Sequence, residues 1–199
     1  GAVQLTDAQG FQYFINTDIT FTTSSSASGA ASEASFTAAV NADTTGGGTS
    51  ASTLNDAFDG FGALCVSTDG DTGPCGSAAP GLGTSNTMYN INGPATTDCG
   101  GRQVLYPVQN IGSLAVSRKV YVPDTDQFIR WANIVTNTGG SAVNVSVITS
   151  NNLGSDTNTA IYTTSDADAT AEPTDSWIVS FQQFSGPTSS DPRLGHVVQ

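Results

Sequence analysis

Hydrophobic and polar residues alternate along much of this chain, and the alternation predicts β-strands. In segment 11–21, FQYFINTDITF, every second residue is hydrophobic except for one threonine. Because successive side chains of a strand point to opposite sides, this pattern predicts a strand with one buried face. Segment 113–122 alternates in the same way and places four aliphatic side chains on one face: Leu114, Val116, Val120 and Val122.

Turn-forming residues separate the predicted strands. Segment 136–141, TNTGGS, lies between the strand candidates QFIRWANIV and SAVNVSVITS. Asn and Gly tolerate positive φ, so this segment predicts a β-hairpin between the two strands. Pro107 lies within the strand candidate RQVLYPVQ and cannot donate a hydrogen bond to a neighbouring strand. It therefore predicts a sheet edge or a β-bulge.

The whole pattern is typical of an all-β protein. It contains roughly eleven strand candidates at the spacing of β-sandwiches, and no long segment has a helical period. Long loops rich in Gly, Ser and Thr connect the candidates, without a clean linker or a repeat of fixed length. We therefore expect one domain over residues 1–199, a single antiparallel β-sandwich of two packed sheets.

Charge narrows the range of functions. Only 11% of the 199 residues are charged, and five basic residues against seventeen acidic ones give a formal net charge of -12. Nucleic-acid binding depends on Lys and Arg to neutralise phosphates, so this composition argues against it. No hydrophobic run approaches the roughly 20 residues that span a bilayer, so we expect no direct membrane insertion. The acidic, lysine-poor composition favours an extracellular or cell-surface location.

Segment 65–75, CVSTDGDTGPC, allows two interpretations. In the first interpretation, Asp69 and Asp71 match the D-x-D start of an EF-type calcium loop, and the hydroxyl of Thr72 would add a third oxygen ligand. Calcium prefers six to eight oxygen ligands, and this loop lacks the closing glutamate of an EF-type site. The simpler interpretation is a turn in which aspartates cap backbone groups. Apart from this candidate Ca2+ site, we expect no cofactor.

Three cysteines permit one disulfide and leave one thiol. Spacing alone does not decide whether Cys65 pairs with Cys75 or with Cys99. We expect the Cys65–Cys75 pair because these two residues bracket a turn.

Catalytic residues are hard to find in the sequence. Glu33 and Glu172 are the only glutamates, and both lie in stretches rich in Ser, Ala and Thr that are typical of a protein surface. His196 is the single histidine, and the chain has no G-x-S-x-G motif around a nucleophilic serine. We therefore expect no enzymatic activity. Tyr89 and Tyr106, next to loops rich in Gly and Pro, are the better candidates for a ligand-binding platform, whereas the tryptophans fit core positions.

Two segments resemble known sequences. VSRKVYVPDTDQFIRWANIVTNTGGSAVNVSVITSNNLGSD (116–156) resembles a β-sandwich segment of large secreted bacterial surface proteins, and LNDAFDGFGAL (54–64) is similar to an acidic stretch of such segments. The resemblance implies an extracellular, adhesin-like module, often one of many in a long protein. It implies no catalytic residue.

Together these patterns predict an extracellular structural or adhesive module. It would act as a surface spacer, an adhesin domain or a filament subunit assembled through β-strand edges. The strand predicted in segment 11–21 is a candidate for pairing with a neighbouring copy. The expected partners are other copies of the chain or other surface proteins. The alternative function is a carbohydrate-binding module of a larger secreted protein, and its partners would be glycans.

Overall fold

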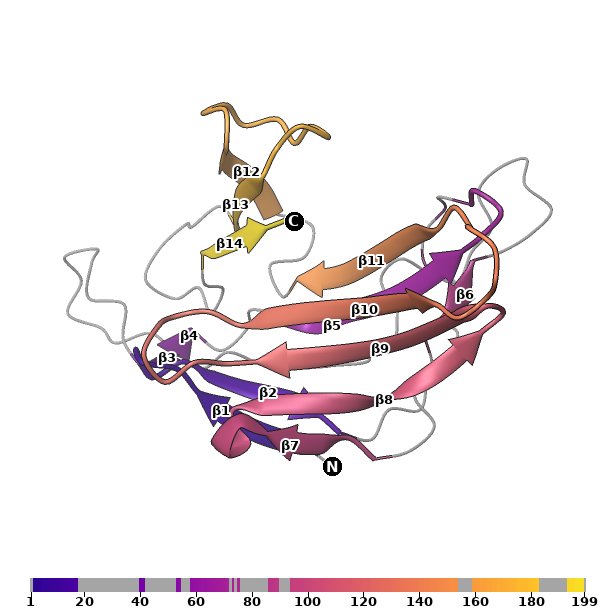
Figure 1. Ribbon diagram of the computed structural model, residues 1–199. Coiled ribbons are helices and arrows are strands. Elements are labelled where there is room, and N and C mark those ends of the chain that lie inside the picture. Colours follow the sequence, from indigo (N-terminus) through magenta and orange to yellow (C-terminus); the bar gives the residue numbers. More distant parts are fainter. Residues whose placement is uncertain are drawn as a thin grey trace. The chain divides into compact units, whose positions relative to one another are not determined.

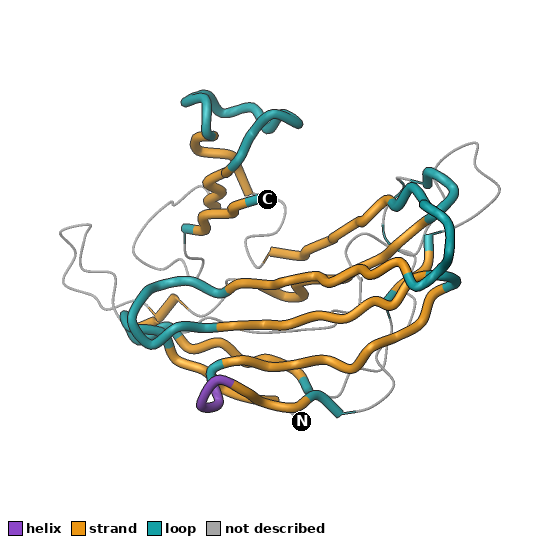
Figure 2. Tube along the Cα trace, in the orientation of Figure 1, coloured by secondary structure: helices purple, strands orange, loops and turns teal. Residues whose placement is uncertain are grey.

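The computed structural model describes residues 2–17, 40–41, 53–54, 58–71, 73, 75, 86–89, 94–153, 159–182 and 193–198. Within these residues the regular structure consists of β-strands and one short 3-10 turn, Cys99–Gly101. The strands form five sheets, and their described pairs are antiparallel (Figures 1 and 2). The predicted all-β class is confirmed.

The chain divides into two compact units. The first contains residues 1–36 and 60–152, and the second contains residues 37–59 and 153–199. The antiparallel sheets are established, whereas the single domain and the single sandwich of about eleven strands remain predictions.

A four-stranded sheet forms the largest described part of the first unit. Its strand order is β10 (Arg130–Asn137), β9 (Leu114–Tyr121), β8 (Gln103–Ile111) and β7 (Thr96–Asp98). Figure 1 shows β8, β9 and β10 running side by side. β8 and β9 form a hairpin in which Gly112 has a φ of 58°, a value that glycine adopts without strain. The register shifts between Tyr106 and Gln109, so the strand pairing is irregular at Pro107, in agreement with the bulge that was one of the two predicted alternatives.

The buried face of β9 follows the predicted alternation. Leu114, Val116, Val120 and Val122 are all at most 1% exposed. Arg118 lies on the same face and is 1% exposed. Its Nε donates a hydrogen bond to Oδ1 of Asn133 on β10, across 2.7 Å. The sequence pattern did not identify this buried arginine.

Two further sheets contribute to the first unit. β1 (Ala2–Thr6) and β2 (Gln12–Asn16) pair as a hairpin, and the other sheet has the order β11 (Ser146–Leu153), β5 (Phe58–Ser67) and β6 (Thr87–Met88). Tyr13 and Ile15 on β2 are buried, as predicted, but the last residues of predicted segment 11–21 lie outside the described part. β2 pairs with β1 of its own chain along its described length.

The predicted hairpin between the strands on either side of segment 136–141 is wrong. β10 is hydrogen bonded to β9, whereas β11 belongs to the sheet of β5. The backbone N–H of Thr138 donates to the carbonyl of Ser113 across 2.8 Å, which ties the segment to the β8–β9 turn. Asn137 also accepts a hydrogen bond from the N–H of Gly139. The glycines therefore form a turn, but the chain then crosses to another sheet.

The second unit contains the remaining two sheets. β12 (Thr159–Thr164), β13 (Trp177–Gln182) and β14 (Leu194–Val197) pair in that order, and β3 (Val40–Asn41) pairs with β4 (Thr53–Leu54). The register of β12 against β13 shifts between Ile161 and Thr163. A loop over residues 165–176, teal in Figure 2, joins β12 to β13.

Candidate functional site

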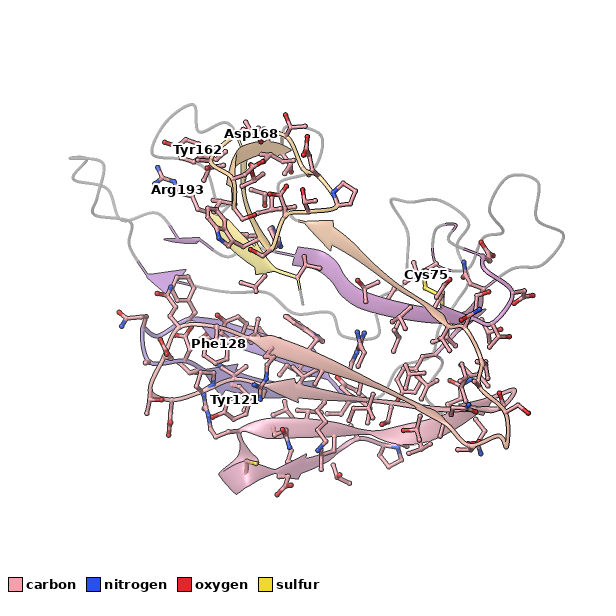
Figure 3. The ribbon with its side chains drawn as sticks, turned by 45° about the horizontal axis from the view of Figure 1, so that its top comes forward. Cys75, Tyr121, Phe128, Tyr162, Asp168 and Arg193 are labelled. Carbon is pink, nitrogen blue, oxygen red and sulfur yellow. A yellow bond between two sulfur atoms is a disulfide. The ribbon has the colours of Figure 1, made fainter. Side chains whose placement is uncertain are left out.

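The loop of residues 65–75 is closed by a disulfide. Cys65 and Cys75 are joined, with their Cα atoms 5.4 Å apart, and Cys65 is fully buried at the end of β5 (Figure 3). The third cysteine, Cys99, has a free thiol and is exposed. Disulfides form and persist in oxidising compartments, so the pair indicates such an environment.

Asp71 is the central polar residue of this loop. It is fully buried, and its Oδ1 accepts a hydrogen bond from the backbone N–H of Gly73 across 2.7 Å. Its Oδ2 accepts from the backbone N–H of Asn86 across 2.8 Å. The side-chain amide of Asn86 donates to the carbonyl of Gly73 across 3.1 Å. The carboxylate therefore joins the loop to the segment that precedes β6.

The other candidate calcium ligands lie differently. Asp69 is exposed, and its Oδ1 accepts a hydrogen bond from the hydroxyl of Ser67 across 3.0 Å. Thr72 lies outside the described residues. Among the residues that the structure describes, no three His, Cys, Asp or Glu side chains are grouped to hold a metal ion. The hydrogen bonds account for Asp69 and Asp71 as turn residues, and calcium binding remains a prediction.

A second buried carboxylate organises the turn between β1 and β2. Asp7 is 6% exposed, and its Oδ1 accepts hydrogen bonds from the N–H groups of Gln9 and Phe11. Its Oδ2 accepts from the hydroxyl of Tyr13 across 3.0 Å. Burial raises the pKa of Tyr13, and the nearby negative charge of Asp7 raises it further. An aspartate directly after an alternating segment was the available sequence signal, and the sequence analysis missed it.

The acidic segment 165–176 forms the β12–β13 loop. The hydroxyl of Thr164, a fully buried residue, lies 2.6 Å from Oδ1 of Asp166 and 3.2 Å from Oδ1 of Asp168. Oδ1 of Asp168 also accepts from the backbone N–H of Thr170. These contacts hold the first half of the loop in a defined conformation.

Asp175 holds the second half of the same loop. Its Oδ2 accepts from the backbone N–H of Glu172 across 2.8 Å, and its Oδ1 accepts from the hydroxyl of Ser165 across 2.9 Å. The hydrogen bond from the Glu172 backbone lowers the pKa of Asp175, and the Ser165 hydroxyl adds to this effect. The negative charge of Asp175 is therefore favoured.

The single histidine contacts a serine. Oγ of Ser180 on β13 lies 2.7 Å from Nε2 of His196 on β14. Burial lowers the pKa of His196, because it disfavours the charged imidazolium. Ser180 is only 5% exposed, and no carboxylate of the described residues hydrogen bonds to His196. The sequence analysis missed this pair, whose members lie sixteen residues apart on paired strands. The lack of enzymatic activity stays a prediction.

The predicted ligand platform is wrong, because both tyrosines are buried. Tyr89 is fully buried and its hydroxyl donates to the carbonyl of Pro107, and Tyr106 is 4% exposed on the inner face of β8. Among the described residues, the most exposed aromatic side chain lies on the second unit instead. Tyr162 is 74% exposed and Trp177, expected in the core, is 38% exposed.

The first unit presents a different aromatic cluster at one end of its four-stranded sheet. The ring centroids of Tyr121 and Phe128 are 6.4 Å apart, with the rings tilted by 52° (Figure 3). The guanidinium carbon of Arg130 lies 5.5 Å from the centre of the Tyr121 ring, within the range of a cation–π interaction. Phe128 is 41% exposed. We call Tyr121, Phe128 and Arg130 the aromatic–arginine cluster.

Comparison with known proteins adds no assignment. No protein family model, no curated protein and no solved structure matches the chain. The resemblance of segments 116–156 and 54–64 to bacterial surface proteins thus stays an expectation. Within the described residues, no helix has the length and hydrophobicity needed to cross a membrane.

Proposed function

We propose that the chain is an extracellular structural or adhesive module: a surface spacer, an adhesin domain or a filament subunit assembled through β-strand edges. The observation that carries the proposal is that aspartate side chains hold the backbone of the loops through hydrogen bonds. Asp7, Asp71, Asp168 and Asp175 each accept a hydrogen bond from a backbone N–H of their own loop. Together with the Cys65–Cys75 disulfide, these bonds restrain the loops, as a module that carries mechanical tension or sets spacing requires.

The edges available for assembly differ from the one that the sequence suggested. β2 is hydrogen bonded to β1, so its donation to another copy would first break that pairing. β7 is the outer strand of the four-stranded sheet, and its three residues are all exposed. An exposed edge strand can accept a strand of another chain through main-chain hydrogen bonds.

Assembly and adhesion are directly measurable. We expect the purified chain to associate as its concentration rises in sedimentation velocity, and to form regular particles or filaments in negative-stain electron microscopy. A fluorescently labelled chain should also bind to cell surfaces more strongly than a heat-unfolded control. A chain that stays monomeric at all concentrations and binds no surface would contradict the proposal.

A carbohydrate-binding module is the second candidate, and the aromatic–arginine cluster favours it. Aromatic rings stack on sugars, and the Arg130 guanidinium supplies hydrogen-bond donors beside them. The test is a glycan array with the wild-type chain and with Phe128→Ala. Binding that the substitution abolishes would support this function, and an array without any binding would exclude it for the glycans tested.

A further inference from the structure

The basic residues of this acidic chain are concentrated in one part of it. Four of the five are adjacent to or within the four-stranded sheet: Arg102, Arg118, Lys119 and Arg130. Strands β8, β9 and β10 contain no aspartate or glutamate. Asp98 lies on β7, and Asp124 and Asp126 lie in the connection between β9 and β10, so the excess of positive charge is confined to strands β9 and β10 of a protein whose formal net charge is -12.

Two of these cations lie on the outer face of the sheet. Lys119 is directly opposite Leu105 and Ala132, and Arg130 is directly opposite Tyr121, so their side chains share the face that Arg118 and the buried valines do not occupy. Both Lys119 and Arg130 are exposed.

Neither cation is paired with an acid. No carboxylate of the described residues lies within the 4.0 Å ion-pair distance of the Lys119 ammonium or the Arg130 guanidinium. Phe128 and Ile134, 41% and 37% exposed, add apolar surface beside them. We call Lys119, Tyr121, Phe128, Arg130 and Ile134 the cationic face.

The second unit presents a surface with the opposite charge. Asp166, Asp168 and Glu172 are exposed on the β12–β13 loop. The backbone N–H of Thr164 donates to the carbonyl of Asp168, and the backbone N–H of Glu172 donates to the carboxylate of Asp175, so the loop backbone is held in place. A preorganised loop loses little conformational entropy on binding. The exposed rings of Tyr162 and Trp177 lie at the strand ends next to this loop. This surface, like the cationic face, combines charge with apolar area.

We infer that the cationic face of one copy binds the acidic β12–β13 loop of a second copy. Carboxylates of the loop pair with Lys119 and Arg130, while the exposed aromatic and aliphatic side chains are buried between the copies. The two surfaces differ, so the contact is heterologous and each copy keeps one free surface of each kind. Repetition of the contact produces a head-to-tail chain.

This inference rests on the proposed function as a filament subunit. The net negative charge of each copy opposes association, but at physiological ionic strength screening limits this repulsion to about 8 Å. Contacts between complementary surfaces then determine the orientation of the copies.

Two substitutions that change the net charge by the same amount test the contact. Association is measured by sedimentation velocity over a range of protein concentrations. Lys119→Gln and Gln4→Glu each make the chain more negative by one charge, and Gln4 lies on β1, outside the cationic face. We expect Lys119→Gln to weaken association at least fivefold and Gln4→Glu to change it less than twofold. Equal melting temperatures confirm that both variants fold.

A charge exchange tests the partner. Lys119→Glu reverses the face, and Glu172→Lys reverses a loop position whose side chain is exposed. Each variant alone should associate at least tenfold more weakly than the wild type. Their mixture should recover association, because the intact face of one binds the intact loop of the other and the two reversed surfaces are again complementary.

The outcomes separate this inference from the proposed function. If the wild type associates and neither variant changes this association, the inference is overturned. The proposed function as a filament subunit is then still supported. An effect of Lys119→Gln on sedimentation that is the same at every protein concentration would not be an effect on association, and it would also overturn the inference. No association and no surface binding by any variant would overturn the proposed function.

Discussion

The hydroxyl of Tyr13 donates a hydrogen bond to the carboxylate of Asp7, and both residues are buried. The same carboxylate accepts from two backbone N–H groups of the turn between β1 and β2. One side chain therefore fixes both the turn and the strand that follows it. Asp71 has a comparable role, because it links its own loop to Asn86.

Removal of the Asp7 carboxylate should destabilise the first unit. In Asp7→Ala, two backbone N–H groups and the Tyr13 hydroxyl lose their acceptor, and hydrogen bonds to charged groups contribute about 1.5–3 kcal/mol each. Because water replaces some of them, we expect the free energy of unfolding in urea to fall by about 2–3 kcal/mol. Asp124→Ala, at an exposed position, is the control and should change it by less than about 0.5 kcal/mol. An equal effect of both substitutions would contradict this role.

High pH should weaken the same contact. The pKa of Tyr13 is raised in the folded protein, so its stabilising contribution is complete below the unfolded tyrosine pKa of about 10 and is lost as pH rises above it. We expect unfolding free energies to fall above pH 10 in the wild type, and to fall less steeply in Tyr13→Phe. Tyr162→Phe removes the hydroxyl of a residue that is 74% exposed. The unfolding free energy of this variant should fall as steeply above pH 10 as that of the wild type.

Substitution of Asp69 or Asp71 by asparagine should change the free energy of unfolding by different amounts. Asp71→Asn places an amide between two backbone donors, so we expect a loss of about 1–3 kcal/mol in EDTA. Asp69→Asn affects an exposed side chain and should stay within about 0.5 kcal/mol. Isothermal titration with calcium completes the test. Heat and a raised melting temperature in the wild type, both lost in Asp69→Asn, would establish the calcium site in place of the simple turn.

The disulfide-bonded cysteines and the free thiol should react differently with an alkylating reagent. Alkylation without reduction should modify Cys99 and leave Cys65 and Cys75 joined in the peptide map. Replacing Cys65 and Cys75 together by alanine should cost about 2–3 kcal/mol, because the disulfide closes a loop of roughly ten residues in the unfolded chain. Cys99→Ser, at an exposed position, is the matched control and should cost little. A peptide map that links Cys99 to either residue would refute this pairing.

Mild acid should destabilise the second unit. The pKa of His196 is lowered in the folded protein, so its contribution is complete above the unfolded histidine pKa of about 6.5 and is lost as pH falls below it. In His196→Gln, an amide can still hydrogen bond to Ser180 but does not titrate. We expect melting temperatures to fall between pH 6.5 and 5 in the wild type and to fall less in this variant. Equal slopes would show that other groups cause the acid sensitivity.

Several features of the fold were predictable because they depend on local chemistry. Leu114, Val116 and Val120 alternate with more polar residues, and a strand buries every second side chain, so the buried face of β9 follows from the sequence. Pro107 lacks a backbone N–H, so a disturbance of the ladder at this position was also predictable. Turn chemistry similarly accounts for Asp71 of the disulfide loop, which accepts hydrogen bonds from backbone N–H groups.

The sequence could not determine which strands pair, or what a buried polar side chain contacts. Asn137 and the following glycines form a turn both in a hairpin and in a crossover between sheets, and only the pairing of β11 with β5 decides between them. Tyr106 and Tyr121 occupy similar strand patterns, yet the first is buried and the second carries Arg130 over its ring. Local polarity sets the alternation of a strand, whereas residues distant in the chain decide which face meets the core. The contact between Ser180 and His196 likewise exists only because β13 and β14 lie side by side.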